Sequence, residues 1–151
     1  MIPNEFIVEP ATWAADMTEL RAVRTEVFVD EQAVPEEEEW DELDALSQHV
    51  IARDQKGLPI GTGRLTPEGT IGLMAVLRDW RGRGVGDAIL RVLLEIARAR
   101  HFREIEIHAQ SHALAFYERA GFEAYGEEFD ECGILHRHMR IELPAMEPRH
   151  R

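Results

Sequence analysis

The chain has 151 residues, a single cysteine and a formal net charge of −12. This length suits one compact core rather than two ordinary domains, so we expect a single domain over residues 1–151 with a flexible tail after about residue 144. No apolar run approaches the roughly 18 residues that cross a bilayer, the first residues lack a secretion-signal pattern, and Cys132 has no disulfide partner; these features predict a cytoplasmic protein without a membrane partner.

The first half of the chain predicts a strand, a helical segment and three more strands. Residues 5–10 have a strand-like composition, and apolar residues at three- and four-residue steps over 11–32 predict one or two helices. The three later β-type runs are separated by glycine-containing turns, which predicts consecutive antiparallel strands. These runs are residues 48–54, 59–66 and 70–77.

The second half predicts two helices and three strands. A helix with an apolar stripe follows from Asp87, and a strand covers 104–110. Ser111 is a candidate N-cap of a second helix, and Gly121 suits its C-terminal end. Strands are expected at 122–129 and 134–143. The order of elements predicts a mixed α/β layer fold.

Charge is distributed unevenly along the chain. The window 78–103 contains seven arginines and three acids, a net charge of +4, whereas the rest of the chain carries −16. Because nucleic acid binding favours basic residues over a broad surface, this distribution argues against a nucleic acid partner. The window 26–44 contains ten acids and no Lys or Arg. It is either a solvated surface or mobile loop, or a mouth that attracts a cationic substrate.

The stretch "RGRGVG" at residues 81–86 follows a strand and precedes the regular helix. A strand, a glycine-rich turn and a helix N-terminus together direct unpaired backbone N–H groups at one point, which favours phosphate binding. The chain lacks the GxxxxGK[ST] pattern of a Walker loop, and its glycine spacing differs from GxGxxG of a dinucleotide-binding fold. A surface turn with solvated arginines is the alternative interpretation.

The spacing Arg81-x-x-Gly84-x-Gly86 resembles the R/Q-x-x-G-x-G/A signature with which GNAT acetyltransferases hold the pyrophosphate of acetyl-CoA. The resemblance covers nearly the whole chain and is closest to the ElaA-like group, through "EVFVDEQAVPEEEEWDELD", "IGTGRL", "HAQSHALAFYERAGF" and "GEEFDECGILHRHM". It implies the GNAT fold, an α/β architecture with a mixed central sheet of about seven strands flanked by about four helices. It also implies acetyl-CoA as co-substrate, with no metal.

The resemblance further implies roles for individual residues. The backbone of Met74, Ala75 and Val76 would run along the pantetheine arm, and the Val76 N–H would polarise the thioester carbonyl. Tyr117 would donate a proton to the leaving thiolate. The backbone amides that would hold the pyrophosphate belong to Arg81, Gly82, Arg83, Gly84, Val85, Gly86 and Asp87, and further cofactor contacts are expected from Gln110, Ala113 and Phe116.

A primary amine is mostly protonated at neutral pH, so acyl transfer to it needs a base. The strand at 70–77 has no carboxylate, and the candidates are therefore Glu31, Asp41, Asp44 and His108. Asp41, Asp44 and Arg64 are also candidate substrate contacts. His136-x-His138 could bind a metal with His108 or His112, but transfer from a thioester needs no Lewis acid, and we expect no metal.

Three functions remain open from the sequence. The first is an N-acetyltransferase that acts on a small, cationic amine. The second is an acyltransferase similar to acyl-homoserine-lactone synthases. The residues that resemble parts of the pattern of those enzymes are Arg24, Phe28, Glu39-x-Asp41-x-x-Asp44 and Arg64. The third is a non-catalytic sensor of acyl-CoA. A homodimer is possible in each case, although no stretch predicts an interface.

Overall fold

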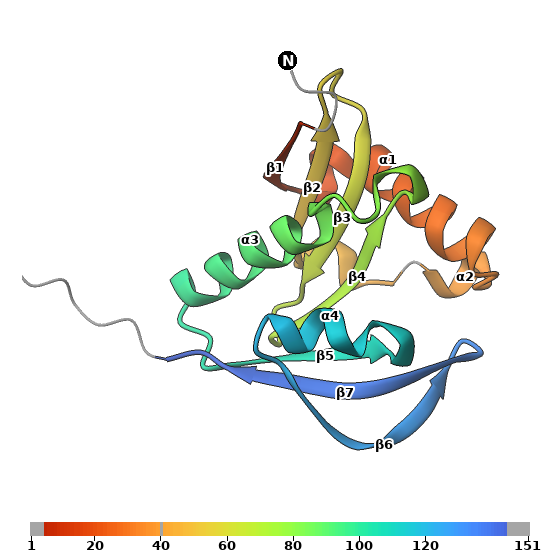
Figure 1. Cartoon of the computed structure of the whole chain (residues 1–151). Coiled ribbons are helices and arrows are strands. Elements are labelled where there is room, and N and C mark those ends of the chain that lie inside the picture. Colours follow the sequence, from red (N-terminus) through yellow and green to blue (C-terminus); the bar gives the residue numbers. More distant parts are fainter. Residues whose placement is uncertain (1–4, 40, 145–151) are drawn as a thin grey trace, which may run out of the picture.

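A computed structural model describes residues 5–39 and 41–144; the expected tail after residue 144 lies outside the described part. Seven strands and four α-helices are connected by short helical turns (Figure 1). The strands are Phe6–Ala11 (β1), Gln48–Asp54 (β2), Pro59–Leu65 (β3), Thr70–Val76 (β4), Glu104–Gln110 (β5), Glu123–Glu131 (β6) and Ile134–Glu142 (β7). The α-helices are Trp13–Arg24 (α1), Glu36–Glu39 (α2), Val85–Ala99 (α3) and Leu114–Arg119 (α4). A π-helix covers Thr25–Glu31 (η1), and the 3₁₀ turns are Asp44–Leu46 (η2), Arg78–Trp80 (η3) and Ser111–Ala113 (η4). None of the helices in this described part has the length and apolar content needed to span a membrane.

The strands form one mixed sheet in the order β1-β2-β3-β4-β5-β7-β6. Neighbouring strands are antiparallel except β4 and β5, which are parallel. The expected sheet of about seven strands is confirmed, as is the antiparallel run of β2, β3 and β4.

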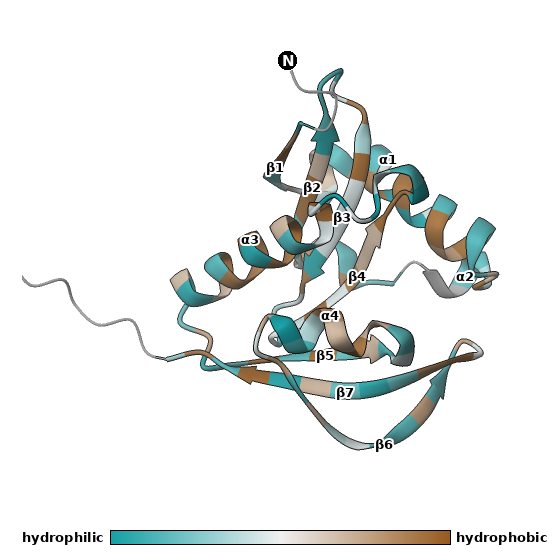
Figure 2. Ribbon diagram, in the orientation of Figure 1, coloured by the Kyte–Doolittle hydropathy of each residue, from teal (hydrophilic) through white to brown (hydrophobic). Residues whose placement is uncertain are grey.

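Helices α1 and α3 cover opposite faces of the sheet (Figure 1). On β3, a Cβ at Gly61 or Gly63 would lie within 3 Å of Ile89 on α3. The helix can therefore approach the strand closely only because these residues have no side chain. Apolar and hydrophilic residues alternate along α3 (Figure 2), and its apolar side joins the main core. Ile51 of β2 faces the other way and packs with Leu20 of α1.

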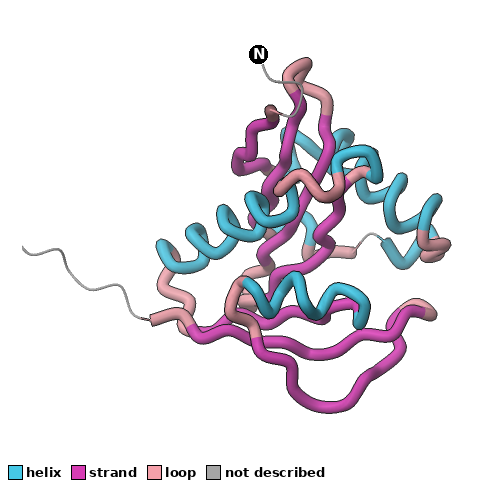
Figure 3. The backbone as a smooth tube through the Cα atoms, in the orientation of Figure 1, coloured by secondary structure: helices cyan, strands magenta, loops and turns pink. Residues whose placement is uncertain are grey.

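Strands β4 and β5 pair over a short distance and then separate. Their aligned pairs are Thr70 with Glu106 and Ile71 with Ile107. Beyond these pairs the two halves of the sheet diverge (Figure 3). Leu73 has a φ of 51°, and the register between β3 and β4 shifts at this point. A bulge of this kind bends a strand, and the gap that opens between β4 and β5 positions the site described below.

The expectation of one or two helices over 11–32 is confirmed: an α-helix ends at Arg24 and continues as a π-helix over Thr25–Glu31. Such wide turns are rare and often occur at functional sites. One local expectation needs correction. Ser111 is not an N-cap, because α4 begins at Leu114 and the Ser111 hydroxyl donates to the Glu128 carboxylate. The expected role of Gly121 at the C-terminal end of this helix is confirmed: it follows the C-cap residue Ala120 and has a φ of 105°.

Candidate active site

The arginine-glycine segment connects η3 to α3. Gly82 and Gly84 have φ values of 76° and 84°, in the left-handed region that glycine adopts without a Cβ clash. The first hydrogen bond of α3 runs from the Ala88 N–H to the Gly84 carbonyl, so the amides of residues 84–87 precede the helical ladder. These amides lie at the positive end of the helix dipole, where an anion is stabilised.

A cavity of about 350 Å³ adjoins this segment. Its lining residues are Val76, Trp80, Arg81, Gly82, Gly84, Val85, Gly86, Asp87, Phe116 and Arg119. Phe116 lies so close to the backbone that a Cβ at Gly86 would be 3.3 Å from its ring. Arg83 does not line the cavity, and its guanidinium lies over the Trp80 ring. Arg119, which the sequence analysis missed, adds a cation from α4; no local pattern marks it, because its position depends on how α4 packs beside the loop.

The Arg81 side chain is occupied by other parts of the protein. Its two terminal nitrogens donate to the Glu31 carboxylate, each at 2.7 Å, and its Nε donates to the Val76 carbonyl at 2.9 Å. The bidentate pair joins η1 to the arginine-glycine segment, and the Nε bond joins that segment to the end of β4. The hydrogen bond from Arg81, opposed by burial and supported by the charges of Arg81 and Arg78, holds the pKa of Glu31 below its ordinary value. Glu31 is therefore an ionised structural partner of Arg81 and a weak base.

The end of β4 exposes backbone groups to the gap. Val76 is aligned with Gly61 of β3, while the hydrogen bond beside this pair runs from the Leu77 N–H to the Ile60 carbonyl. In an antiparallel ladder, a residue next to such a bond directs its own N–H away from the partner strand. The Val76 N–H therefore faces the side where β5 has separated.

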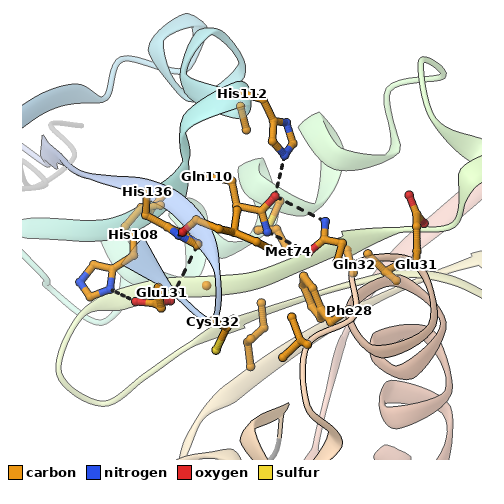
Figure 4. Close-up of a pocket in the computed structure, with 18 of the residues that line it drawn as sticks. Phe28, Glu31, Gln32, Met74, His108, Gln110, His112, Glu131, Cys132 and His136 are labelled. Atoms are coloured by element: carbon orange, nitrogen blue, oxygen red, sulfur yellow. Dashed lines mark hydrogen bonds and ion pairs between the residues drawn. The ribbon is translucent and has the colours of Figure 1, made fainter. Parts of the chain in front are cut away.

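A second cavity, of about 460 Å³, occupies the gap between β4 and β5 (Figure 4). Its walls come from η1, the second half of β4, β5, the segment at 112–117 and the β6–β7 hairpin. The lining residues are Val27, Phe28, Glu31, Gln32, Val34, Gly72, Leu73, Met74, Ala75, Val76, Arg81, Ile107, His108, Gln110, His112, Ala113, Tyr117, Glu131, Cys132, Ile134 and His136. All three predicted catalytic residues, Glu31, His108 and Tyr117, are among them.

Tyr117 contributes a buried phenol to this cavity. It is 7% exposed, and its ring packs edge-on against Phe116 and Phe122. Burial raises the pKa of Tyr117 to about 12. The hydroxyl thus stays protonated at neutral pH and can act as a hydrogen-bond donor.

Gln110 participates in a bridge across the gap. Its amide and that of Gln32, the residue after η1, bond reciprocally, at 3.0 and 3.4 Å. His112 Nε2 lies 2.6 Å from Gln110 Oε1 (Figure 4). A cofactor contact from Gln110 remains a prediction, and it would have to coexist with or replace these bonds.

His108 is paired with a carboxylate from the β6–β7 hairpin. Its Nδ1 lies 3.1 Å from Glu131 Oε1, and His136 Nε2 lies 3.9 Å from Glu131 Oε2. The hydrogen bond to Glu131, opposed by burial and supported by the charges of Glu131 and Glu106, raises the pKa of His108. The same hydrogen bond from His108, opposed by burial and supported by the charges of His136, His108 and His138, lowers the pKa of Glu131. Sequence reasoning missed Glu131, because no local pattern connects it to His108.

The other predicted substrate residues lie elsewhere. Asp44 is 1% exposed, and its carboxylate accepts hydrogen bonds from Arg24 at 2.9 Å and from Arg64 at 3.0 Å. Arg64 also pairs with Asp41 at 2.8 Å. None of these residues lines either cavity. Contact of Asp41, Asp44 and Arg64 with the acceptor stays a prediction, and this arrangement does not favour it. The three residues pair with one another and with Arg24 in a network that connects α1, β3 and the segment before β2.

From the sequence, His136 and His138, together with His108 or His112, are candidate metal ligands, and the structure groups these histidines differently. Within the described ranges, the one group with ligand atoms all within 4.8 Å of one another is Glu106, His108 and His138. His136 instead has its Nδ1 2.7 Å from the Ile134 carbonyl. The Glu106 carboxylate accepts the Tyr125 hydroxyl at 2.6 Å. We assign no metal to this group.

Comparison with known proteins places this geometry in a family. Residues 13–143 match the family model described as an acetyltransferase (GNAT) domain. The chain belongs to the GNAT acetyltransferase family. Among its GNAT relatives, the uncharacterized N-acetyltransferase YjcF of Bacillus subtilis is 38% identical over 121 residues, which cover 78% of this chain and 86% of the relative.

Solved structures agree with the GNAT assignment. An acyl-CoA N-acyltransferase from Pseudomonas aeruginosa is 30% identical, with a TM-score of 0.80 over 91% of this chain and 99% of the other. Escherichia coli ElaA is 23% identical and has a TM-score of 0.80 over 91% of this chain and 100% of its own, a likeness that concerns the fold. The expected GNAT fold is therefore confirmed, and the protein is an acyltransferase by family.

The glycine loop of this GNAT protein offers a first prediction. Gly84→Ala places a Cβ in the left-handed region, which costs about 1–2 kcal/mol, and a loop that relaxes this strain no longer aligns its amides. We expect the free energy of unfolding to fall by about that amount and the affinity for coenzyme A to fall by about tenfold. Urea unfolding and calorimetric titration with coenzyme A measure the two effects.

Gly57 provides the matched control for Gly84→Ala. It has nearly the same φ, 83°, in the turn between β2 and β3, and like Gly84 it has no atom within 4 Å of an added Cβ. Gly57→Ala should therefore lower stability equally and leave coenzyme A binding unchanged. Equal affinities for coenzyme A in the two variants would contradict a phosphate-binding role of the loop.

Proposed function

We propose that the protein transfers the acetyl group of acetyl-CoA to the primary amine of a small molecule by direct attack on the thioester. The observation that supports this most is that the two cavities share Val76 and Arg81 as lining residues. A pyrophosphate held by the loop amides would lead the pantetheine arm past Val76, along the open edge of β4. The thioester would then lie in the central cavity near Tyr117.

The residues around this position suit acyl transfer. The Val76 N–H faces the gap and is a preorganised donor for the thioester carbonyl, whose oxygen gains negative charge during attack. The Tyr117 hydroxyl, protonated at neutral pH because of its raised pKa, is a donor for the sulfur as the C–S bond breaks. Attack forms the C–N bond, and the nitrogen then gives up a proton while the thiolate gains one and leaves as the free thiol of coenzyme A.

The amine must first become neutral. Removing a proton from an amine with a pKa near 10.4 costs about 4.6 kcal/mol at pH 7. Among the predicted bases, Asp41 and Asp44 lie outside the cavities, and Glu31 is bonded to Arg81. His108 lines the central cavity with a raised pKa and is the candidate that the geometry favours.

A cationic acceptor remains part of the proposal. The net charge of −12 attracts cations over a distance. Within the central cavity the carboxylates are Glu31 and Glu131, and the first is neutralised by arginine. The single cysteine fits a reducing compartment such as the cytoplasm, where acetyl-CoA is available.

Release of free thiol from acetyl-CoA in the presence of a panel of amines tests the function. We expect turnover with at least one small cationic amine, and rates that fall as salt screens the attraction. Acyl carrier protein thioesters should be poor donors; if they were preferred, the activity would resemble that of acyl-homoserine-lactone synthases. Tight binding of acetyl-CoA without thiol release across the panel would indicate a sensor instead.

A further inference from the structure

The two faces of the sheet give the central cavity two sides. On β5, Ile107 and Ala109 point into the core beneath α3 and α4, together with Ile105. His108 alternates with them and therefore faces the other side, the side on which η1 packs Val27 and Phe28 against Ala75 of β4. Because the phosphate loop and Tyr117 approach from the α3 and α4 side, the side of His108 is left for the acceptor.

Of the two carboxylates that line the central cavity, Glu31 and Glu131, one remains available to a base. Glu31 binds Arg81 through both oxygens. Glu131, from the end of β6, instead contacts His108 through Oε1 and approaches His136 through Oε2. Figure 4 shows Glu131 with His108 and His136, apart from Glu31 at the other end of the cavity.

We propose that Glu131 is a positioning residue that holds His108 as the base that deprotonates the acceptor amine. This inference rests on the proposed acetyl transfer. With its Nδ1–H donated to Glu131 Oε1, neutral His108 keeps the lone pair on Nε2, and Glu131 stabilises the imidazolium formed when that lone pair takes a proton. A carboxylate, an imidazole and a reacting group in this order are the general arrangement of an oriented base.

The protons balance in two steps. The acceptor ammonium gives its first proton to His108 Nε2, which later releases it to water. The neutral amine then forms the C–N bond as the C–S bond breaks, and its second proton goes to the coenzyme A thiolate, with Tyr117 as the neighbouring donor. The products are the amide, the thiol of coenzyme A and one proton in solution.

The charged and titratable groups around His108 come from three strands. Glu131 lies on β6, His138 on β7 with its ring centroid 4.7 Å away, and Glu106 on β5 itself. Phe129 of β6 packs edge-on against the same ring at 5.3 Å. His136 of β7 faces Glu131. The hydrogen bond to Glu131 and the charges of Glu131 and Glu106 raise the pKa of His108, while burial opposes them.

Glu131→Gln keeps the size of the side chain and removes its charge. We expect kcat/KM for the amine to fall about tenfold, less than the roughly 100-fold loss expected for His108→Gln. The acid limb of the kcat/KM profile should move to lower pH in Glu131→Gln, because the imidazole loses the charge that raises its pKa. The double variant should be no slower than His108→Gln alone, since Glu131 acts through His108.

Glu128→Gln is the matched control. Glu128 lies on the same strand and is bonded to Ser111, and it lines neither cavity. This variant should keep the wild-type rate and pH profile. If Glu131→Gln left the acid limb in place, or if the losses of the two single variants multiplied in the double variant, the proposed role of Glu131 would be wrong.

A measurement without substrate separates this inference from the proposed function. The titration of the His108 imidazole, followed by NMR in wild type and Glu131→Gln, should shift to lower pH in the variant. An unchanged titration overturns the pairing, whatever the activity. Absence of thiol release by the wild-type protein with every amine overturns the proposed acetyl transfer, and with it the assignment of His108 as its base.

Discussion

Tyr117→Phe is expected to lower kcat by about 10²- to 10⁴-fold, the range observed for removal of a general acid. The change deletes one hydroxyl and keeps the ring, so the edge-on contacts with Phe116 and Phe122 are retained. Binding of coenzyme A should stay near the wild-type value, because the contacts proposed for the pyrophosphate and the pantetheine arm do not include the hydroxyl. Thiol-release kinetics and calorimetry measure the two quantities.

Tyr125, the other tyrosine of the chain, serves as the control. Its hydroxyl also has a pKa raised to about 12, chiefly through its hydrogen bond to Glu106, yet it lines neither cavity. Tyr125→Phe should therefore retain most of the wild-type kcat. A Tyr117→Phe variant as active as Tyr125→Phe would show that the thiolate leaves without help from this hydroxyl.

The pH dependence gives a further check on Tyr117. Because burial raises its pKa to about 12, the hydroxyl stays protonated throughout the neutral and mildly alkaline range. The wild-type rate should show no loss from ionisation of Tyr117 below about pH 10. A decline in kcat near pH 9 that is absent from Tyr117→Phe would contradict the burial of this side chain.

The elements that the sequence predicts well depend on local patterns. The runs at 48–54 and 104–110 coincide with β2 and β5, since alternation and flanking turns determine short strands. The glycine loop is equally local, because positive φ, as at Gly82 and Gly84, favours residues without a Cβ. The position of Ser111 is less predictable, since its hydroxyl has a partner on β6 rather than in its own helix.

Which side chains line the cavity, and which of them pair with one another, depends on contacts between segments distant in the sequence. Glu131 reaches His108 because β6 and β5 both flank β7, and Glu31 meets Arg81 across fifty positions of sequence. From the sequence, the acidic window at 26–44 could be the entrance of a site that attracts a cationic substrate. In the structure, Glu31, Asp41 and Asp44 are instead paired with arginines from other elements, and no linear pattern shows which acids have such partners.

Three of the residues that resemble the pattern of acyl-homoserine-lactone synthases belong to a buried network. Arg24, Asp44 and Arg64 form connected ion pairs between α1, β3 and the segment before β2, and none of them lines either cavity. These residues therefore do not favour one donor over another. The glycine loop, with its amides and adjoining cavity, is the feature that bears on the donor.

Asp44→Asn is expected to destabilise the protein by about 3–5 kcal/mol, the cost of breaking a buried ion pair. The substitution keeps the shape of the side chain and removes the negative charge that faces the guanidinium groups of Arg24 and Arg64. Asp44 and Arg24 are both 1% exposed, so water does not compensate for the lost charge. Urea unfolding at neutral pH measures the change in the free energy of unfolding.

Asp41→Asn is the control for Asp44→Asn, because Asp41 pairs with the same Arg64 at 2.8 Å but has a side chain 46% exposed. A solvated ion pair contributes about 0–1 kcal/mol to stability. The free energy of unfolding of Asp41→Asn should therefore fall by no more than this amount. Similar losses in the two variants would contradict the argument that burial, rather than the number of ion pairs, gives the network its effect.

Wild type and Asp44→Asn differ in their free energy of unfolding, and the pH dependence of this difference follows from the pKa of Asp44. Burial by itself raises this pKa, but the hydrogen bond and charge of Arg24 and the charge of Arg64 outweigh it and hold the pKa below the ordinary 3.8. A carboxyl with a lowered pKa in the folded state stabilises the fold fully above the unfolded value and loses this contribution as pH falls through the folded one. The stability gap between the two proteins should therefore be constant near neutral pH and shrink below about pH 4, and a gap that grew with acidification would mean that Asp44 is protonated in the native protein.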